Sequence, residues 1–169
     1  MEKNKMTFVK DLPNKKIIVE REFDAPLTDV WRAWTESELL EQWWAPHPWR
    51  AETKSMDFRE GGYWLYSMVG PKNERHWSKA EFVKINNLKS FETHNYFCDE
   101  NGVKNPEVGS GTWKNNFVAT ADGTKVTVEI LFSSEKHMAT FVEMGFEAGF
   151  TAALGNLDEY FEEQLKLKK

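Results

Sequence analysis

Apolar side chains recur at helical spacing toward the end of the chain. From Phe146 to Leu165 they follow one another at intervals of four, with a single interval of three, which places them on one stripe of an α-helix. Most charged residues between them fall on the other face, including the pair Asp158-Glu159, which the pattern places toward solvent. A helix of about 20 residues is about 30 Å long, so residues 144–165 are predicted to cross a whole small domain.

Most of the preceding chain alternates between apolar and polar positions, which is typical of half-buried β-strands. The first such stretch, residues 16–23, places Ile17, Val19, Arg21 and Phe23 on one face. Further strands are predicted at residues 51–58, 63–69, 77–85, 90–98, 112–120 and 125–132. The dipeptide Asp-Gly between the last two favours a tight hairpin turn.

Two short helices are predicted between the first strand and the others. Pro26 suits the first position of a helix, whose apolar side would carry Trp31 and Trp34. Thr35 and Glu38 have the spacing of a capping box, which predicts that a second short helix begins there.

This order of elements predicts an α+β fold in one domain, with a curved antiparallel sheet of about seven strands wrapped on the long C-terminal helix. The sheet needs a cover for its apolar face, and the last helix supplies it. Residues 1–14 are predicted to be a flexible N-terminal tail or a short extra strand before a domain over residues 15–169. Residues 99–111 contain little apolar content and predict a long mobile loop.

Charge and composition exclude several classes of partner. The formal net charge of −5 argues against a nucleic-acid groove, because phosphate binding needs a basic surface. No apolar run is long enough for a membrane span or a signal peptide, and the single Cys98 excludes an intramolecular disulfide. We therefore expect a cytoplasmic protein that has no membrane span and does not bind nucleic acid.

No recognisable catalytic or metal-binding pattern stands in the sequence. The four histidines, His47, His76, His94 and His137, have no partner at the spacing of a metal site. Gly109-Ser110-Gly111 lacks the spacing of a nucleophile elbow. We predict no catalytic residue, no metal and no cofactor.

The aromatic content points instead to a binding cavity. Eight Trp and twelve Phe are many for 169 residues, and such side chains either fill a thick core or line an apolar pocket with a few polar groups. Tyr66, Thr93, Asn95 and Asn115 share the strand faces that carry these aromatic residues. A buried polar group without a partner costs about 1–3 kcal/mol, so we interpret these four as groups that orient a ligand in a cavity of about 300–1,000 Å³.

Several motifs in the same order resemble a known family over residues 16–165. They are REFDAP at 21–26, VWRAWT at 30–35, WWAP at 43–46, FREGG at 58–62 and the glycine-aromatic-leucine pattern at 145–157. They resemble the Hsp90-ATPase-activator-homologue-like proteins of the START/Bet v 1-like (SRPBCC), helix-grip superfamily. The loop at 99–111 is longer than is usual there, which bears on the pocket mouth.

The resemblance implies a helix-grip fold that holds an apolar ligand such as a lipid, a sterol or a polyketide between sheet and long helix. The predicted ligand-binding residues are Trp64, Tyr66, Phe82, Asn95, Phe97, Trp113, Asn115, Phe117, Phe146 and Phe150. Two alternatives stay open: an enzyme of the cyclase/aromatase kind using the same pocket, and a module that binds an Hsp90-like chaperone partner. The oligomeric state and the identity of the ligand are not predicted.

Overall fold

A single antiparallel sheet of eight strands forms most of the molecule, in the order β1-β2-β8-β7-β6-β5-β4-β3. The computed structural model describes residues 6–167. The strands are β1 (Met6–Asp11), β2 (Lys16–Phe23), β3 (Arg50–Met56), β4 (Tyr63–Val69), β5 (Arg75–Asn86), β6 (Ser90–Cys98), β7 (Gly111–Ala119) and β8 (Thr124–Phe132). The helices are α1 (Leu27–Thr35), α2 (Ser37–Trp43), α3 (Glu135–Glu143) and α4 (Phe146–Leu167).

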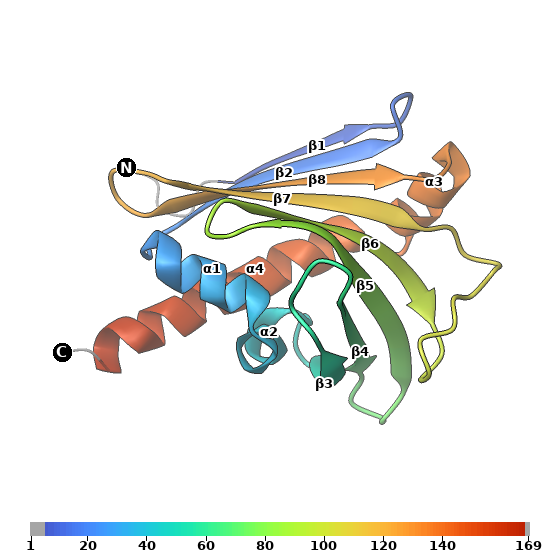
Figure 1. Ribbon diagram of the computed structural model, residues 1–169, viewed down its shortest axis with the longest axis horizontal. Coiled ribbons are helices and arrows are strands. Elements are labelled where there is room, and N and C mark those ends of the chain that lie inside the picture. The colour runs from blue at the N-terminus through green and yellow to red at the C-terminus, as the bar shows by residue number, and fades with distance from the viewer. Residues whose placement is uncertain (1–5, 168–169) are drawn as a thin grey trace.

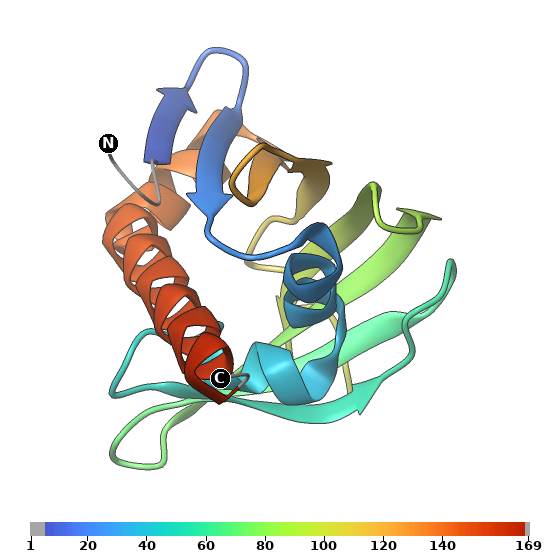
Figure 2. The ribbon, with the colours of Figure 1, turned by 90° about the vertical axis from the view of Figure 1, so that its left-hand side faces the viewer.

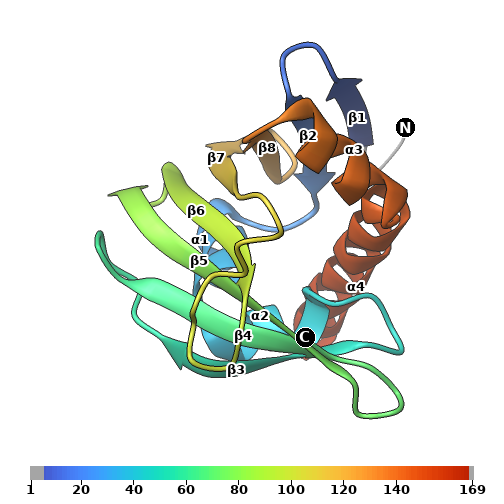
Figure 3. The ribbon, with the colours of Figure 1, turned by 90° about the vertical axis from the view of Figure 1, so that its right-hand side faces the viewer.

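The sheet is an open arc that wraps around α4. Figure 3 shows the arc running from β1 and β2 to β3, with α4 lying across the space between its two ends. The short helices α1 and α2 lie inside the arc (Figures 1 and 2). The predicted α+β helix-grip architecture is confirmed, because a long C-terminal helix and two short helices cover the concave face.

The apolar stripe of α4 explains its position. Phe150, Leu154, Leu157 and Phe161 are buried, whereas Leu165 is 48% exposed near the end of the helix. The helix begins at Phe146 rather than at 144 because Gly145, with φ +88°, breaks it from α3.

Cross-strand register brings the aromatic side chains onto one face. Trp64 lies opposite Ala80, so these residues and Phe82 share the concave face as predicted. In β2, Ile17, Val19, Arg21 and Phe23 are the buried positions, which confirms the predicted alternation.

Residues 6–11 form the edge strand β1, paired with β2, so of the two alternatives predicted for residues 1–14, a flexible tail or a short extra strand, the strand holds for this part. The sheet therefore has eight strands rather than about seven, and residues 1–5 lie outside the described residues.

Two other sequence predictions differ from the structure. Thr35 is the last residue of α1 and donates to the Trp31 carbonyl oxygen at 2.8 Å, so it does not cap α2. Asp158 is not a solvent residue, because it forms an ion pair with the inward-facing Arg21.

The loop after β6 covers the outer face of the sheet and is held there by hydrogen bonds. The Glu100 carbonyl oxygen accepts a hydrogen bond from Lys54 Nζ in β3 at 2.7 Å, and Gly102 lies against Leu65 and Lys79. Leu65 and Lys79 point away from the concave face, so this part of the loop packs on the convex side of the sheet. This part of the loop is therefore not a rim of the interior, whereas Gly109 at its other end lies against Ser133 and His137.

Within residues 6–167, no helix combines the length and hydropathy that crossing a bilayer requires.

Candidate functional site

A small cavity lies inside the arc, between α1, α2 and the concave faces of β3–β7. Its volume is about 30 Å³. Its lining residues are Trp34, Leu40, Trp44, Met56, Trp64, Ala80, Phe82, Phe91, Thr93, Asn95, Trp113 and Asn115. This volume accommodates a water molecule or a small polar head group, and it is far below the 300–1,000 Å³ of a usual ligand site.

The predicted volume is therefore wrong for this conformation, and the reason is the packing of α1 and α2. Trp34 and Trp44 come from these two helices and enter the concavity that the sheet encloses. Aromatic rings of this size occupy the space that the strand pattern alone leaves open.

Two polar atoms of the lining are buried and have no hydrogen-bond partner in the described part of the chain. They are the side-chain oxygen Oδ1 of Asn115 and the indole nitrogen Nε1 of Trp34. Asn115 is 3% exposed and Trp34 is 4% exposed. One is an acceptor and the other a donor, which are the two kinds of partner that a hydroxyl group takes.

Strand register explains why Asn115 faces inward. Asn115 lies opposite Phe91 on β6 and opposite Val128 on β8, which are both buried. Its amide nitrogen Nδ2 donates to the Phe91 carbonyl oxygen at 3.4 Å, which leaves the acceptor Oδ1 directed away from that bond. On β6 the neighbouring polar pair satisfies itself, because Thr93 Oγ1 donates to Asn95 Oδ1.

Trp44 lies at the centre of a group of aromatic rings on one side of the cavity, called here the aromatic wall, which it forms with Trp34, Trp43, Trp64, Trp113 and Phe150. Its indole Nε1 donates to the Tyr66 hydroxyl oxygen at 3.1 Å. Its ring contacts Trp34, Trp43, Trp64, Trp113 and Phe150 with centroid distances of 5.3–6.2 Å, all edge-on or tilted.

Tyr66 is held beside this wall on β4. Its ring stacks on Trp64 at 3.8 Å, and the whole side chain is buried. Burial raises the pKa of Tyr66 to about 12, because it disfavours the charged phenolate, while the hydrogen bonds with Trp44 and Ser78 act in the opposite direction. Tyr66 is therefore a neutral hydrogen-bonding group at neutral pH.

Half of the predicted ligand-binding residues line the cavity: Trp64, Phe82, Asn95, Trp113 and Asn115. The structure places the other half, Tyr66, Phe97, Phe117, Phe146 and Phe150, outside its lining. Phe117 packs on α1, and Phe146 and Phe150 stack on each other on α4, where both contact Trp113. Phe97 is only half-buried on β6.

Sequence reasoning missed the contributions of the two short helices. Trp34 and Leu40 line the cavity from α1 and α2, and Trp44 does so from the end of α2. The adjacent Trp43 and Trp44 marked this segment as aromatic, but only tertiary packing determines which ring enters the concavity.

Titratable and metal-ligating side chains determine which chemistry this site can perform. No group of three or more His, Cys, Asp or Glu residues lies close enough there to hold a metal ion. Tyr66 is the ionisable side chain beside the cavity with a displaced pKa, and its displacement keeps the proton on.

Comparison with known proteins places this geometry among solved structures of the same architecture. A solution structure of a protein from Arthrobacter aurescens is 29% identical, covers 93% of this chain and 91% of its own, and superposes with a TM-score of 0.87. The crystal structure of protein Ms6760 from Mycobacterium smegmatis is 26% identical over 92% of this chain and 96% of its own, with a TM-score of 0.85. A solution structure from Staphylococcus epidermidis is 27% identical over 94% and 95%, with a TM-score of 0.82.

Sequence comparison identifies the family of the chain. No curated protein matches the chain at a significant level. The family model described as "Activator of Hsp90 ATPase homolog 1-like protein" matches residues 24–162, which include α1, α2, the strands that line the cavity and most of α4. The chain belongs to this family.

Proposed function

We propose that this protein binds a small, largely apolar molecule that carries one hydroxyl group, in the interior between the sheet and α4. The observation that carries the proposal is the pair of unpartnered polar atoms, Asn115 Oδ1 and Trp34 Nε1, in the lining of one cavity. The rest of the lining is mainly aromatic and aliphatic, so it favours an apolar body attached to that hydroxyl.

The energetic argument rests on the cost of an unsatisfied buried group. Each such group costs about 1–3 kcal/mol, and a ligand hydroxyl that accepts from Trp34 and donates to Asn115 recovers this free energy. An aliphatic ligand without the hydroxyl recovers none of it. Ligand selectivity is therefore expected to come from these two groups rather than from the aromatic wall.

The cavity is smaller than the proposed ligand, so binding requires that side chains of the interior move. The cavity of about 30 Å³ holds the head group alone, so the apolar body takes the place of aromatic rings that now fill the interior. A lipid, a sterol or a polyketide-like molecule matches this description, and the physiological ligand is one of this chemical type.

Two other functions receive less support. A cyclase-type enzyme is best served by an acid or base whose pKa lies near the operating pH, whereas the pKa of Tyr66 beside the pocket is raised to about 12. A chaperone-binding module needs a broad exposed apolar patch, whereas the exposed apolar residues of the described chain are spread over separate elements, such as Val9 on β1, Val83 on β5 and Val118 on β7.

The experiment that tests the proposal is native mass spectrometry of the protein purified from its own host, followed by extraction and identification of any bound molecule. We expect a stoichiometric apolar molecule with a hydroxyl group. In parallel, 1-decanol and decane are compared as probes by thermal unfolding. Stabilisation by 1-decanol but not decane supports the proposal, and an empty protein that neither probe stabilises contradicts it.

A further inference from the structure

Only a few residues of the cavity lining reach the surface, and they mark the routes to the interior. Trp44, Met56 and Asn95 are partly exposed, while the other lining residues are buried. Met56 is fixed in β3 opposite Trp64, and Asn95 is fixed in β6 between Ala80 and Gly111. Trp44 lies outside the strands, at the C-cap of α2, whereas Met56 is the last residue of β3.

Trp44 is less firmly attached than its neighbour Trp43. Trp43 is fully buried, and its Nε1 donates to the Ala33 carbonyl oxygen of α1 at 2.9 Å. Trp44 is partly exposed, and its one side-chain hydrogen bond goes to the Tyr66 hydroxyl. Trp43 therefore anchors the end of α2 to α1 through its indole, whereas the Trp44 indole is hydrogen-bonded to β4 and packs on the aromatic rings of the interior.

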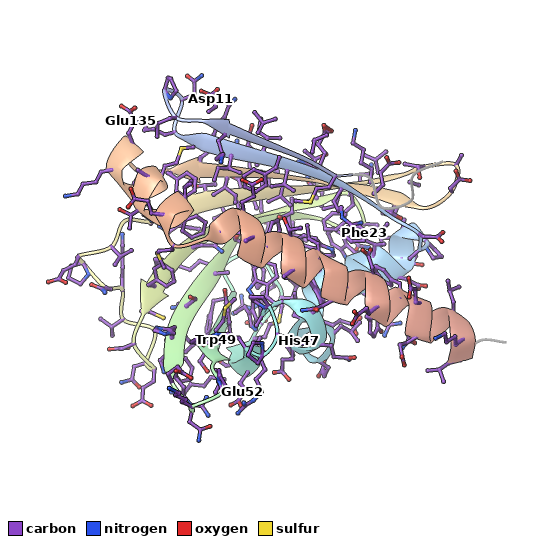
Figure 4. All side chains as sticks on the ribbon, turned by 180° about the vertical axis from the view of Figure 1, so that it is seen from behind. Asp11, Phe23, His47, Trp49, Glu52 and Glu135 are labelled. Atoms are coloured by element: carbon purple, nitrogen blue, oxygen red, sulfur yellow. The ribbon has the colours of Figure 1, made fainter. Side chains whose placement is uncertain are left out.

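The segment that follows Trp44 is fastened to α4 by one side chain. Asn156 Nδ2 donates to the Ala45 carbonyl oxygen at 3.1 Å and also approaches the Trp43 carbonyl oxygen at 3.5 Å. The segment with His47 and Trp49 passes beside α4 (Figure 4), where Pro46 lies close to Gly149. Beyond it, Trp49 packs on His76 of β5 with ring centroids 5.5 Å apart.

We propose that residues 44–49 form a lid over the interior cavity, that Asn156 holds this lid closed, and that a ligand enters by displacing the Trp44 indole. This inference rests on the proposed function, since a lid has a role only if the interior binds a ligand. Displacement of Trp44 vacates the centre of the aromatic wall and frees the Tyr66 hydroxyl. The apolar body of a ligand then takes the place of the indole, next to the head-group site at Trp34 and Asn115.

The lid is tested by the kinetics of binding of 1-pyrenebutanol, a neutral apolar fluorescent dye that carries one hydroxyl group, measured by stopped-flow fluorescence. In the wild type, the observed association rate is expected to level off with dye concentration at the rate of lid opening. Asn156→Ala removes the fastening, so the plateau is expected to rise about fivefold or more. Glu163→Ala, an exposed position on the same helix, is the control and is expected to leave the plateau unchanged.

The movement of Trp44 is observed directly by ¹⁹F NMR of protein labelled with 5-fluorotryptophan. Trp44→Phe assigns the resonance, which is expected to shift on addition of the dye while that of Trp43 stays in place. In Trp44→Ala, the observed association rate is expected to keep rising with dye concentration, without a plateau. This readout does not depend on the folding of the Asn156 variant.

The outcomes separate the lid from the binding proposal. If the dye binds the wild type but the Trp44 resonance stays unchanged and Asn156→Ala has no kinetic effect, the lid is wrong and interior binding stands. If the dye binds neither the wild type nor Trp44→Ala, both the interior-binding proposal and the lid proposal are wrong. Binding to Trp44→Ala that exceeds binding to the wild type supports the lid.

Discussion

The indole nitrogen of Trp44 donates a hydrogen bond to the Tyr66 hydroxyl oxygen at 3.1 Å, which joins the end of α2 to the concave face of β4. This bond lies in the region where we propose that a ligand binds. The ring of Trp44 fills that region, and Tyr66 compensates the polar end of the ring. The interior is therefore closed by a side chain of the protein itself.

Removing the Tyr66 hydroxyl is expected to weaken this closure. Tyr66→Phe leaves the buried Trp44 Nε1–H without its acceptor, and we expect the free energy of unfolding to fall by about 1–2 kcal/mol. Urea denaturation followed by circular dichroism measures the change. Tyr160→Phe on α4, which keeps the ring contact with Phe161, is the matched control with a change of less than about 0.5 kcal/mol. Equal losses in the two variants would contradict a role for the Trp44–Tyr66 bond.

The raised pKa of Tyr66 predicts alkaline sensitivity. Burial favours the neutral phenol and raises the pKa of Tyr66 from 10.0 to about 12 in the folded state, so this contribution to stability is complete below pH 10 and is lost as pH rises toward 12. Tyr96 behaves similarly, because burial and its hydrogen bond to Glu81 raise its pKa to about 12. Absorbance at 295 nm is expected to show two of the four tyrosines ionising late, and Tyr66→Phe to remove one of them. Ionisation of all four near pH 10 in folded protein would refute the burial of Tyr66.

Asn115 is expected to be tolerant of apolar replacement where an ordinary buried polar residue is not. Its Oδ1 has no partner in the described chain, so Asn115→Leu is expected to change the free energy of unfolding by less than about 1 kcal/mol. Thr124→Val is the comparison, because the buried Thr124 hydroxyl donates to the Ala25 carbonyl oxygen at 2.8 Å, and its loss is expected to cost about 1–2 kcal/mol. Thermal unfolding measures both variants. A larger loss for Asn115→Leu than for Thr124→Val would show that Asn115 is a structural residue.

The ion pair between Arg21 and Asp158 is expected to fasten α4 to β2. Arg21 is 7% exposed, so Asp158→Ala leaves a buried guanidinium without its carboxylate and is expected to cost about 2–4 kcal/mol. The exposed pair Lys125–Glu20, at 2.8 Å, is the control, and Glu20→Ala is expected to cost less than about 1 kcal/mol. Denaturant titration of both variants tests this, and similar small losses would mean that solvent reaches Arg21.

His137 of α3 contacts Ser110 in the loop before β7, and this contact is expected to be sensitive to acid. Burial lowers the pKa of His137 from its ordinary 6.5, an effect that its hydrogen bond with the Ser110 backbone opposes. A lowered pKa means that the contact is complete above pH 6.5 and weakens as pH falls through the folded-state value. Hydrogen exchange of residues 135–143 is expected to accelerate on acidification in the wild type. In His137→Phe, which preserves packing on Phe132, this acceleration is expected to disappear.

Sequence patterns predicted the fold well because each relevant signal is local. Alternation along β2 fixed the inward positions of Ile17 and Phe23, and the α4 stripe fixed the burial of Leu154 and Leu157. For residues 6–11 the polar sequence left a tail and a short strand as alternatives, because only the pairing with β2 decides between them.

The site was predicted less completely because its centre depends on tertiary packing. Strand alternation placed Asn115 and Trp113 inside correctly, but it carries no information on which helix fills the concavity. Trp34 and Trp44 therefore went unassigned as lining residues, and the volume was overestimated. Asp158 was placed toward solvent because its partner, Arg21, lies 137 residues earlier in the chain.

The most direct test of ligand binding at the interior head-group site is a ¹H–¹⁵N NMR titration with 1-decanol, with decane as the matched probe. We expect the Trp34 indole N–H resonance, assigned with Trp34→Phe, and the Asn115 side-chain resonances to shift saturably with 1-decanol. Decane is expected to leave the Trp34 resonance in place, and Asn115→Leu is expected to weaken the response to 1-decanol. Equal responses to the two probes, or shifts confined to exposed residues, would contradict ligand binding at Trp34 and Asn115.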